Sequence, residues 1–172
     1  MNEQNGTKGK SACFTGHREI SENPKKLAER LYTVLEGLIT EQGVTDFYAG
    51  GATGFDTIAA QDVLKLRGKH TDVRLHLVLP CSNEEQTKNW TPTQKYDFKS
   101  ILSRADSVEY TSDHFYRGCM GKRNARLVEH AENYCICYLA PDHKSGTAQT
   151  VEMAEKKGLT VINLFQSITK KE

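Results

Sequence analysis

Short apolar segments alternate along this chain with segments of helical periodicity, and this alternation constrains the fold more than any other feature. The apolar segments read as strands that are hydrophobic along their length rather than at every second position, which is typical of a parallel sheet buried on both faces. Crossovers between parallel strands are right-handed and carry helices. The sequence therefore predicts one α/β domain over residues 11–168, a three-layer Rossmann-like fold with a mostly parallel, doubly wound sheet of about six or seven strands. The predicted strands are residues 11–15, 46–49, 74–79, 107–110, 134–139 and 160–164.

The segments between these strands have the spacing of amphipathic helices. The first begins at Pro24, which suits a first helical turn, and ends before Gly43, which suits a helix C-cap. Residues 81–89 are polar and are expected to form a loop, and residues 1–10 are expected to form a disordered leader. The predicted helices are residues 24–42, 57–66, 91–103, 120–130 and 146–157.

The 172 residues suffice for one domain with a sizeable core, and 37% hydrophobic with 26% charged residues is typical of a soluble globular protein. A net charge of +1 offers no overall basic field for nucleic acid or an anionic membrane. No apolar run approaches the length of a transmembrane helix, and the polar N-terminus lacks the apolar core of a signal peptide. A cytoplasmic protein without membrane contact is therefore expected.

Five cysteines, an odd number without a CxxC pair, indicate reduced thiols rather than a disulfide framework or a zinc site. Cys135 and Cys137 fall on the same face of one predicted strand and are interpreted as small core residues. The histidines are scattered, and no set of residues has the spacing of metal ligands. No metal site is predicted.

Three glycines, Gly50, Gly51 and Gly54, follow the second predicted strand and precede a helix. Glycine lets backbone N–H groups approach a ligand closely, and a helix start adds unpaired N–H donors and the positive end of its dipole. This combination is typical of a phosphate-binding turn. The pattern is neither a Walker P-loop nor GxGxxG, and the alternative is a tight connection in which Asp56 is an ordinary N-cap.

Unusual residues also follow the other predicted strands, at the edge of a doubly wound sheet where ligands bind. Three of these segments place glycine next to a hydroxyl residue at a helix start, which is a second signal of anion binding. This coincidence favours a phosphate or nucleotide site over an isolated tight turn. The segments are residues 15–18, 50–56, 80–90, 116–124 and 145–147.

Two arginines in these segments are candidates for neutralising a phosphate. Arg18 has two interpretations: it binds an anion through two parallel hydrogen bonds, or it is a solvated surface residue. Arg123 is expected in the first turn of a helix, where the dipole disfavours a cation, so a position facing an anion is favoured over a surface ion pair. Asn124 beside it either binds ribose or satisfies the helix start.

Three further residues each have competing interpretations. Asp56 is interpreted as a helix cap, as a residue that holds a ribose hydroxyl, or as a residue that acts on a glycosidic carbon. Trp90, the only tryptophan, stacks on a base or packs beneath its polar loop. His17 acts as an acid or base or, as the favoured interpretation, is hydrogen-bonded within its turn.

Several motifs resemble the YpsA-like branch of the SLOG superfamily over nearly the whole chain after residue 10. The resemblance implies a Rossmann-like fold that binds a nucleotide or nucleotide-derived ligand at its glycine-rich loops, in a family of small bacterial or phage proteins. The motifs are FTGHR at 14–18, YAGGATGFDTIAA at 48–60, LVLPC at 77–81 with Trp90 downstream, ADSV at 105–108, Tyr116 with GCMGKRNARLVEHA at 118–131, and GTAQTVEMAEKKGLTVINL at 146–164.

The superfamily includes the lonely-guy phosphoribohydrolases, whose PGGxGTxxE motif cooperates with an arginine on the preceding helix. By this resemblance Arg123 matches that arginine and the pair 146–147 matches the glycine and threonine, whereas residues 143–145 replace PGG and Thr150 occupies the glutamate position. A threonine cannot stabilise an oxocarbenium-like centre as a carboxylate would. Glu152 lies about 200° farther round the helix. Hydrolysis is therefore disfavoured, although Asp56 could supply a carboxylate from another loop.

A third relative, DNA-processing protein A, binds single-stranded DNA, but the near-neutral charge and the lack of a basic stripe with aromatic residues argue against nucleic acid here. We therefore predict a protein that binds a nucleotide or nucleotide-like small molecule as a sensor or carrier, with a nucleotide N-glycosidase as the alternative. No catalytic residue and no cofactor beyond that nucleotide are assigned, and a homodimer or higher oligomer is expected by analogy with other SLOG domains. The phosphate is expected on residues 50–54 and at the helix start 146–147. The predicted ligand-binding residues are Gly16, His17, Arg18, Gly50, Gly51, Thr53, Gly54, Asp56, Trp90, Arg123, Asn124, Gly146 and Thr147.

Overall fold

The computed structural model describes residues 9–141 and 144–166, and these residues form a single parallel sheet with helices on both faces. The strand order is β4-β3-β2-β1-β5-β6, and every neighbouring pair is parallel. The predicted α/β, Rossmann-like class is thus confirmed, with six strands in the described part of the chain. The elements are β1 (Lys10–Gly16), α1 (Pro24–Gln42), β2 (Val44–Ala49), α2 (Phe55–Arg67), β3 (Arg74–Leu79), α3 (Asn83–Thr87), α4 (Pro92–Arg104), β4 (Ser107–Tyr110), α5 (Cys119–His130), β5 (Tyr134–Tyr138), α6 (Gly146–Lys157) and β6 (Thr160–Asn163).

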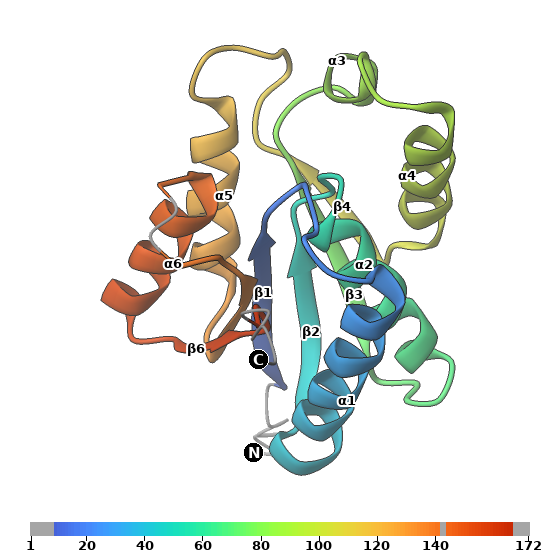
Figure 1. Ribbon diagram of the computed structural model, residues 1–172, viewed down its shortest axis with the longest axis vertical. Coiled ribbons are helices and arrows are strands. Elements are labelled where there is room, and N and C mark those ends of the chain that lie inside the picture. The colour runs from blue at the N-terminus through green and yellow to red at the C-terminus, as the bar shows by residue number, and fades with distance from the viewer. Residues whose placement is uncertain (1–8, 142–143, 167–172) are drawn as a thin grey trace, which may run out of the picture.

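Helices α1, α2 and α4 cover one face of the sheet, and α5 and α6 cover the other (Figure 1). The chain adds β2, β3 and β4 on one side of β1 and then crosses back to place β5 and β6 on its other side. The connections that leave β1 and β5 therefore diverge to opposite faces. In doubly wound sheets this reversal opens a crevice beyond the carboxyl ends of the strands, which point to the top of Figure 1.

The predicted apolar stripe of α1 lies in the main core, where it packs towards α2 and β2. Its start and end follow from local chemistry. The side chain of Asn23 accepts hydrogen bonds from the N–H groups of Lys25 and Lys26, and Gly43 takes a left-handed conformation with φ 75° at the C-cap. The stripe consists of Leu27, Leu31, Leu35 and Leu38, all buried.

Helix α3 corrects the prediction of a loop at residues 81–89. Ser82 begins this helix by accepting a hydrogen bond from the N–H of Glu85, at 3.4 Å. Gln86 is its only buried residue, so the helix has no apolar stripe that a periodicity argument could detect. A second difference lies at the N-terminus, where β1 already includes Lys10, the last residue of the expected leader. Residues 1–8 of that leader lie outside the described part of the chain.

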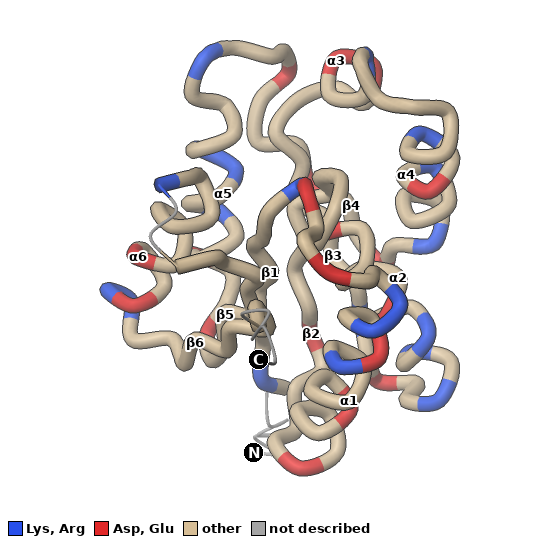
Figure 2. The backbone as a smooth tube through the Cα atoms, in the orientation of Figure 1, with Lys and Arg blue, Asp and Glu red and all other residues tan. Residues whose placement is uncertain are grey.

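The five cysteines are free, as expected for reduced thiols, and all are buried, including Cys135 and Cys137, which were predicted as core residues. Within the described residues no helix is both long and apolar enough to cross a membrane. Acidic and basic residues are interspersed over both helical layers (Figure 2).

Candidate functional site

A cavity of about 270 Å³ lies at the crevice where the strand order reverses. It is bounded by the end of β1, the first turn of α2, the inner side of α5 and the start of α6. Eight of the predicted ligand-binding residues line it: Gly16, His17, Arg18, Asp56, Arg123, Asn124, Gly146 and Thr147. The other described lining residues were not predicted as ligand-binding residues, although four of them lie in the segments singled out by the sequence. They are Phe14, Thr15, Ala52, Met120, Leu127 and Ser145.

The glycine turn, residues 50–54, packs behind one wall of this cavity. Its three glycines are not among the described lining residues. Gly54 has φ +76°, and a Cβ added there would lie 2.2 Å from the backbone oxygen of Arg18. The N–H of Phe55 donates a hydrogen bond to the backbone oxygen of His17 at 3.1 Å. The loops after β1 and β2 are therefore packed backbone to backbone, which only glycine permits at position 54.

Asp56 and Arg123 form the charged floor of the cavity, and their side chains are 5% exposed each. Gly50 separates them, because a Cβ added there would lie 2.6 Å from Nη1 of Arg123 and 3.0 Å from Oδ2 of Asp56. Burial raises the pKa of the Asp56 carboxyl, while the nearby Arg123 charge, the Ala52 N–H and the Arg18 charge act in the opposite direction. Burial likewise lowers the pKa of Arg123, against the favourable charge of Asp56.

Asp56 is not the N-cap that the conservative interpretation expected, because Gly54 caps α2 and Asp56 is the second helical residue. Its Oδ2 accepts a hydrogen bond from the N–H of Ala52 at 3.2 Å. Its Oδ1 is buried and has no hydrogen-bond partner among the residues that the structure describes. A buried acceptor without a partner is costly, so this oxygen is suited to a hydroxyl or N–H group of a ligand in the cavity.

Arg123 is the fifth residue of α5, beyond the first turn in which the sequence placed it, because the helix begins at Cys119. The unfavourable helix dipole therefore no longer indicates that Arg123 faces an anion. The burial of its guanidinium group now supports that interpretation. Nη1 donates to the backbone oxygen of Gly50, and Nε donates to Oδ1 of Asn124 at 2.8 Å. Nη2 lies 3.7 Å from the sulfur of Met120. These contacts exclude the alternative of a surface ion pair. They hold the guanidinium between α5 and the turn that follows β2.

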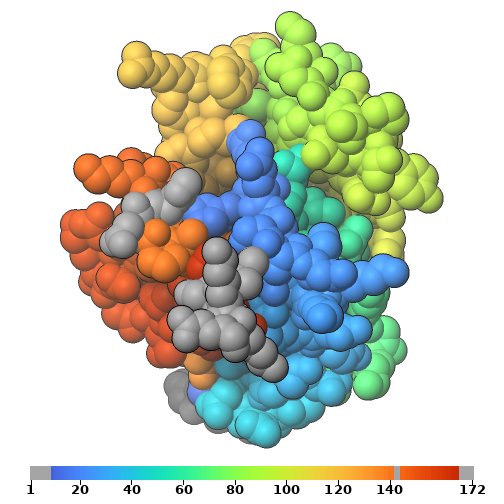
Figure 3. Space-filling view, viewed as in Figure 1, coloured from blue at the N-terminus to red at the C-terminus, as the bar shows by residue number. Residues whose placement is uncertain are grey.

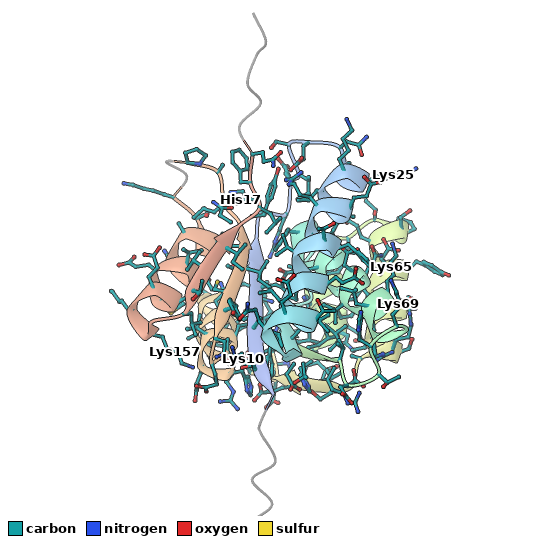
Figure 4. The ribbon with its side chains drawn as sticks, turned by 90° about the horizontal axis from the view of Figure 1, so that it is seen from below. Lys10, His17, Lys25, Lys65, Lys69 and Lys157 are labelled. Carbon is teal, nitrogen blue, oxygen red and sulfur yellow. The ribbon has the colours of Figure 1, made fainter. Side chains whose placement is uncertain are left out.

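His17 lies beside β1 between the two helical layers (Figure 4). The ring Nε2 of His17 accepts a hydrogen bond from the N–H of Ala140 at 2.9 Å. The backbone N–H of His17 donates to the backbone oxygen of Tyr138 at 3.2 Å. An Nε2 that accepts from a backbone amide carries no proton, so it cannot act as an acid at that atom. This geometry supports the favoured interpretation of a hydrogen-bonded turn histidine.

The start of α6 closes the cavity opposite α2. Ser145 is the N-cap, and its side chain accepts a hydrogen bond from the N–H of Ala148 at 3.2 Å. Gly146 and Thr147 occupy the first turn, where helical N–H groups lack intrahelical acceptors. Thr150 is fully buried, and its hydroxyl donates back to the oxygen of Gly146 at 2.8 Å. The position that resembles the lonely-guy glutamate is therefore not among the described lining residues.

A second cavity, of about 540 Å³, adjoins the first and shares Arg18 and Met120 with it. Its lining includes Trp90 and Thr53, two further predicted site residues. Trp90 also packs edge-to-face on Phe98, with ring centroids 5.5 Å apart. The two interpretations of Trp90 are thus compatible, since one part of the ring packs on the core and another faces the cavity.

The sequence profile of the YspA SLOG family (YpsA) matches residues 14–170. An uncharacterized SPbeta prophage-derived protein, YoqJ of Bacillus subtilis, is 31% identical over 143 residues, which cover 76% of this chain and 81% of that protein. The UPF0398 protein BH1768 of Halalkalibacterium halodurans is 26% identical over 143 residues, covering 82% and 71%. The X-ray structure of TM1055, a structural genomics target, aligns with a TM-score of 0.55 at 15% identity, over 88% of this chain and 72% of that one. At that identity the last likeness concerns the fold alone.

Proposed function

Because this chain belongs to the YspA SLOG family, we propose that it binds a nucleotide or nucleotide-derived ligand in the first cavity, as a sensor or carrier. The observation that carries the proposal is the buried Asp56 carboxyl group in the lining of this cavity, whose Oδ1 has no partner among the described residues. A sugar hydroxyl is the ligand group that best matches such an acceptor, because it brings a donor without adding charge.

Positively charged groups in the other walls of the cavity would bind the anionic part of the ligand. Arg18 is exposed at the rim, and Arg123 lies at the floor beside the N-terminal turn of α6. Guanidinium groups and helix N-termini are the usual protein partners of phosphate. An anion here would also offset the cost of burying Arg123, whose pKa is lowered chiefly by its burial. Asn124 is held against Arg123 and borders both the anion and the sugar positions.

A thermal-shift screen of nucleoside mono-, di- and triphosphates tests this proposal. A ligand at 100 times its dissociation constant adds about 2.7 kcal/mol to the free energy of unfolding, which corresponds to a shift of roughly 5–10 °C for a domain of this size. Arg18→Ala should reduce the shift without unfolding the protein, because Arg18 is exposed. Arg104→Ala is the matched control, since Arg104 is an exposed arginine at the end of α4 that lines neither cavity. Absence of any shift in folded, ligand-free protein would contradict the proposal.

The second candidate is a nucleotide N-glycosidase, favoured by one observation, the buried carboxyl group of Asp56 in the lining of the first cavity. In that reaction water adds across the bond between the sugar and the base, and free base and sugar phosphate leave. Asp56 is the only carboxylate among the described residues that line the first cavity. Its role would be to stabilise the positive charge that develops at the sugar carbon.

Chromatography of a bound nucleotide after prolonged incubation separates the two functions. A sensor or carrier returns the nucleotide unchanged, and this is the result that we expect. If free base accumulates, Asp56→Asn should stop its release while the nucleotide still binds, because asparagine keeps the size of the side chain but removes the charge. Release of base by the wild-type protein would replace the binding function with the glycosidase.

A further inference from the structure

The second cavity lies next to the first, on the side of the loop that precedes α5. Arg18 and Met120 belong to the walls of both. Figure 3 shows the segment after β1, in blue, between the loop before α5, in yellow, and the region of α3 and α4, in green. The first cavity alone, at about 270 Å³, is smaller than the usual small-molecule site, whereas the two together fall within the usual range.

Gln86 lines the second cavity and carries a buried hydrogen-bond acceptor without a partner among the described residues. Its side-chain Nε2 donates to the backbone oxygen of Gly51 at 3.1 Å, which sets the orientation of the amide. Its Oε1 is buried and finds no partner within residues 9–141 and 144–166. Gln86 is 8% exposed and lines this cavity, and a ligand N–H group that reached the buried oxygen would satisfy it.

Two aromatic side chains border the same space from different parts of the chain. Trp90 is anchored by its contact with Phe98, and Phe115 is 57% exposed on the loop before α5. That loop is tied to α3, because the N–H of Phe115 donates to Oε2 of Glu85 at 3.0 Å. A rim of two aromatic rings and an amide acceptor is suited to a flat heterocycle, which aromatic side chains bind by stacking.

We propose that the second cavity receives the base of the ligand, with Trp90 and Phe115 along its faces and Gln86 Oε1 accepting an N–H at its edge. This inference rests on the proposed function and specifies its ligand class. The ligand is a nucleoside phosphate whose sugar phosphate occupies the first cavity and whose base carries an N–H donor. Arg18, at the junction, lies where the two parts of the ligand meet.

Calorimetric titrations with AMP, GMP, CMP, UMP and ribose 5-phosphate test this assignment. At least one nucleotide should bind tenfold or more tightly than ribose 5-phosphate, because base stacking on aromatic residues contributes strongly to affinity. If AMP is that nucleotide, the monophosphate of purine riboside, which lacks only the amino group, should lose about tenfold in affinity, because Gln86 Oε1 is left unpaired.

Phe115→Ala supplies the protein-side test, since this exposed ring can be removed without opening the core. The variant should weaken nucleotide binding about tenfold and leave ribose 5-phosphate binding unchanged. Tyr96→Ala is the matched control, because Tyr96 is a 74% exposed aromatic residue on α4 that lines neither cavity. Equal affinities for nucleotides and ribose 5-phosphate, unaffected by Phe115→Ala, would overturn the assignment and leave the first cavity as the binding site. Failure of every probe to bind would overturn the proposed function as well.

Discussion

Gly54→Ala should lower the free energy of unfolding by about 3 kcal/mol or more. The residue has φ +76°, and forcing alanine into that region costs about 1–3 kcal/mol. The added Cβ would also lie 2.2 Å from the backbone oxygen of Arg18, and overpacking of this kind costs a further 1–3 kcal/mol or so. The neighbouring atom belongs to the backbone, so a side-chain rotation cannot relieve the contact. Urea unfolding of both proteins measures the difference.

Gly37→Ala is the matched control for this change. Gly37 lies inside α1, and a Cβ added there has no heavy atom within 4 Å. Alanine in a helix interior is about 0.5–1 kcal/mol more favourable than glycine, so this variant should be slightly more stable than the wild type. If Gly54→Ala and Gly37→Ala had similar midpoints, the close packing of the loops after β1 and β2 would be refuted.

Asp62→Asn should remove a pH-dependent loss of stability on the order of 4 kcal/mol. Asp62 is a residue of α2 that is 2% exposed, and its Oδ2 has no partner in the part of the chain that the structure covers. It lies beneath a groove between α1 and α2 that Lys25 and Lys65 border, on the outer side of these helices in Figure 4. Burial raises the pKa of its carboxyl from 3.8 to about 7, with the charge of Lys65 acting in the opposite direction.

The direction of the effect follows from proton binding. Between pH 4 and pH 7 the folded protein keeps the Asp62 proton while the unfolded chain has released it, so stability falls as pH rises through this window. Below pH 4 both states are protonated and the carboxyl has no effect, and above pH 7 the full penalty is present. Each pKa unit corresponds to about 1.4 kcal/mol, which gives the order of magnitude above.

Urea unfolding at pH 4 and at pH 8 tests this effect. The difference in stability between Asp62→Asn and the wild type should become more favourable to the variant by several kcal/mol at the higher pH, because all other titrating groups are shared. Asp72→Asn serves as the control, since Asp72 is exposed and its replacement should add no such pH dependence. A difference between Asp62→Asn and the wild type that stays constant with pH would rule out a buried, protonated Asp62.

Much of the fold could be predicted because the relevant signals are local. The ends of α1 follow from Asn23, Pro24 and Gly43, and its inner face follows from a regular leucine stripe. Parallel pairing followed from the alternation of strands with helices, and the crevice followed from the topology. Eight of the predicted site residues line the first cavity for the same reason, because loops at one edge of such a sheet lie near one another. The prediction of strands buried on both faces was wrong for the edge strands β4 and β6, which contain no buried residue.

The remaining features depend on contacts that local patterns do not encode. Gln86 lies in a polar five-residue helix, and its role follows only from the position of Gly51 after folding. The burial of Arg123 depends on the carbonyl of Gly50, a residue far away in the chain. The sequence suggested that Asp56 is a helix cap, because helix starts favour acidic residues. In the structure its Oδ2 instead accepts a hydrogen bond from the N–H of Ala52 and so stabilises the glycine turn. Self-association remains a prediction by analogy with other SLOG domains.

The position of β1 at the centre of the sheet has a consequence for synthesis of the chain. β1 pairs with β5 only after the ribosome has made the C-terminal third, and the bond from the Ser11 N–H to Asn133 spans 122 residues. At typical rates of elongation this interval is roughly ten seconds. Until then β1 is an unprotected, apolar edge strand of the emerging β1–β4 half, and such edges recruit other chains. Premature termination before residue 134 should therefore yield aggregates or chaperone-bound fragments rather than a smaller folded domain.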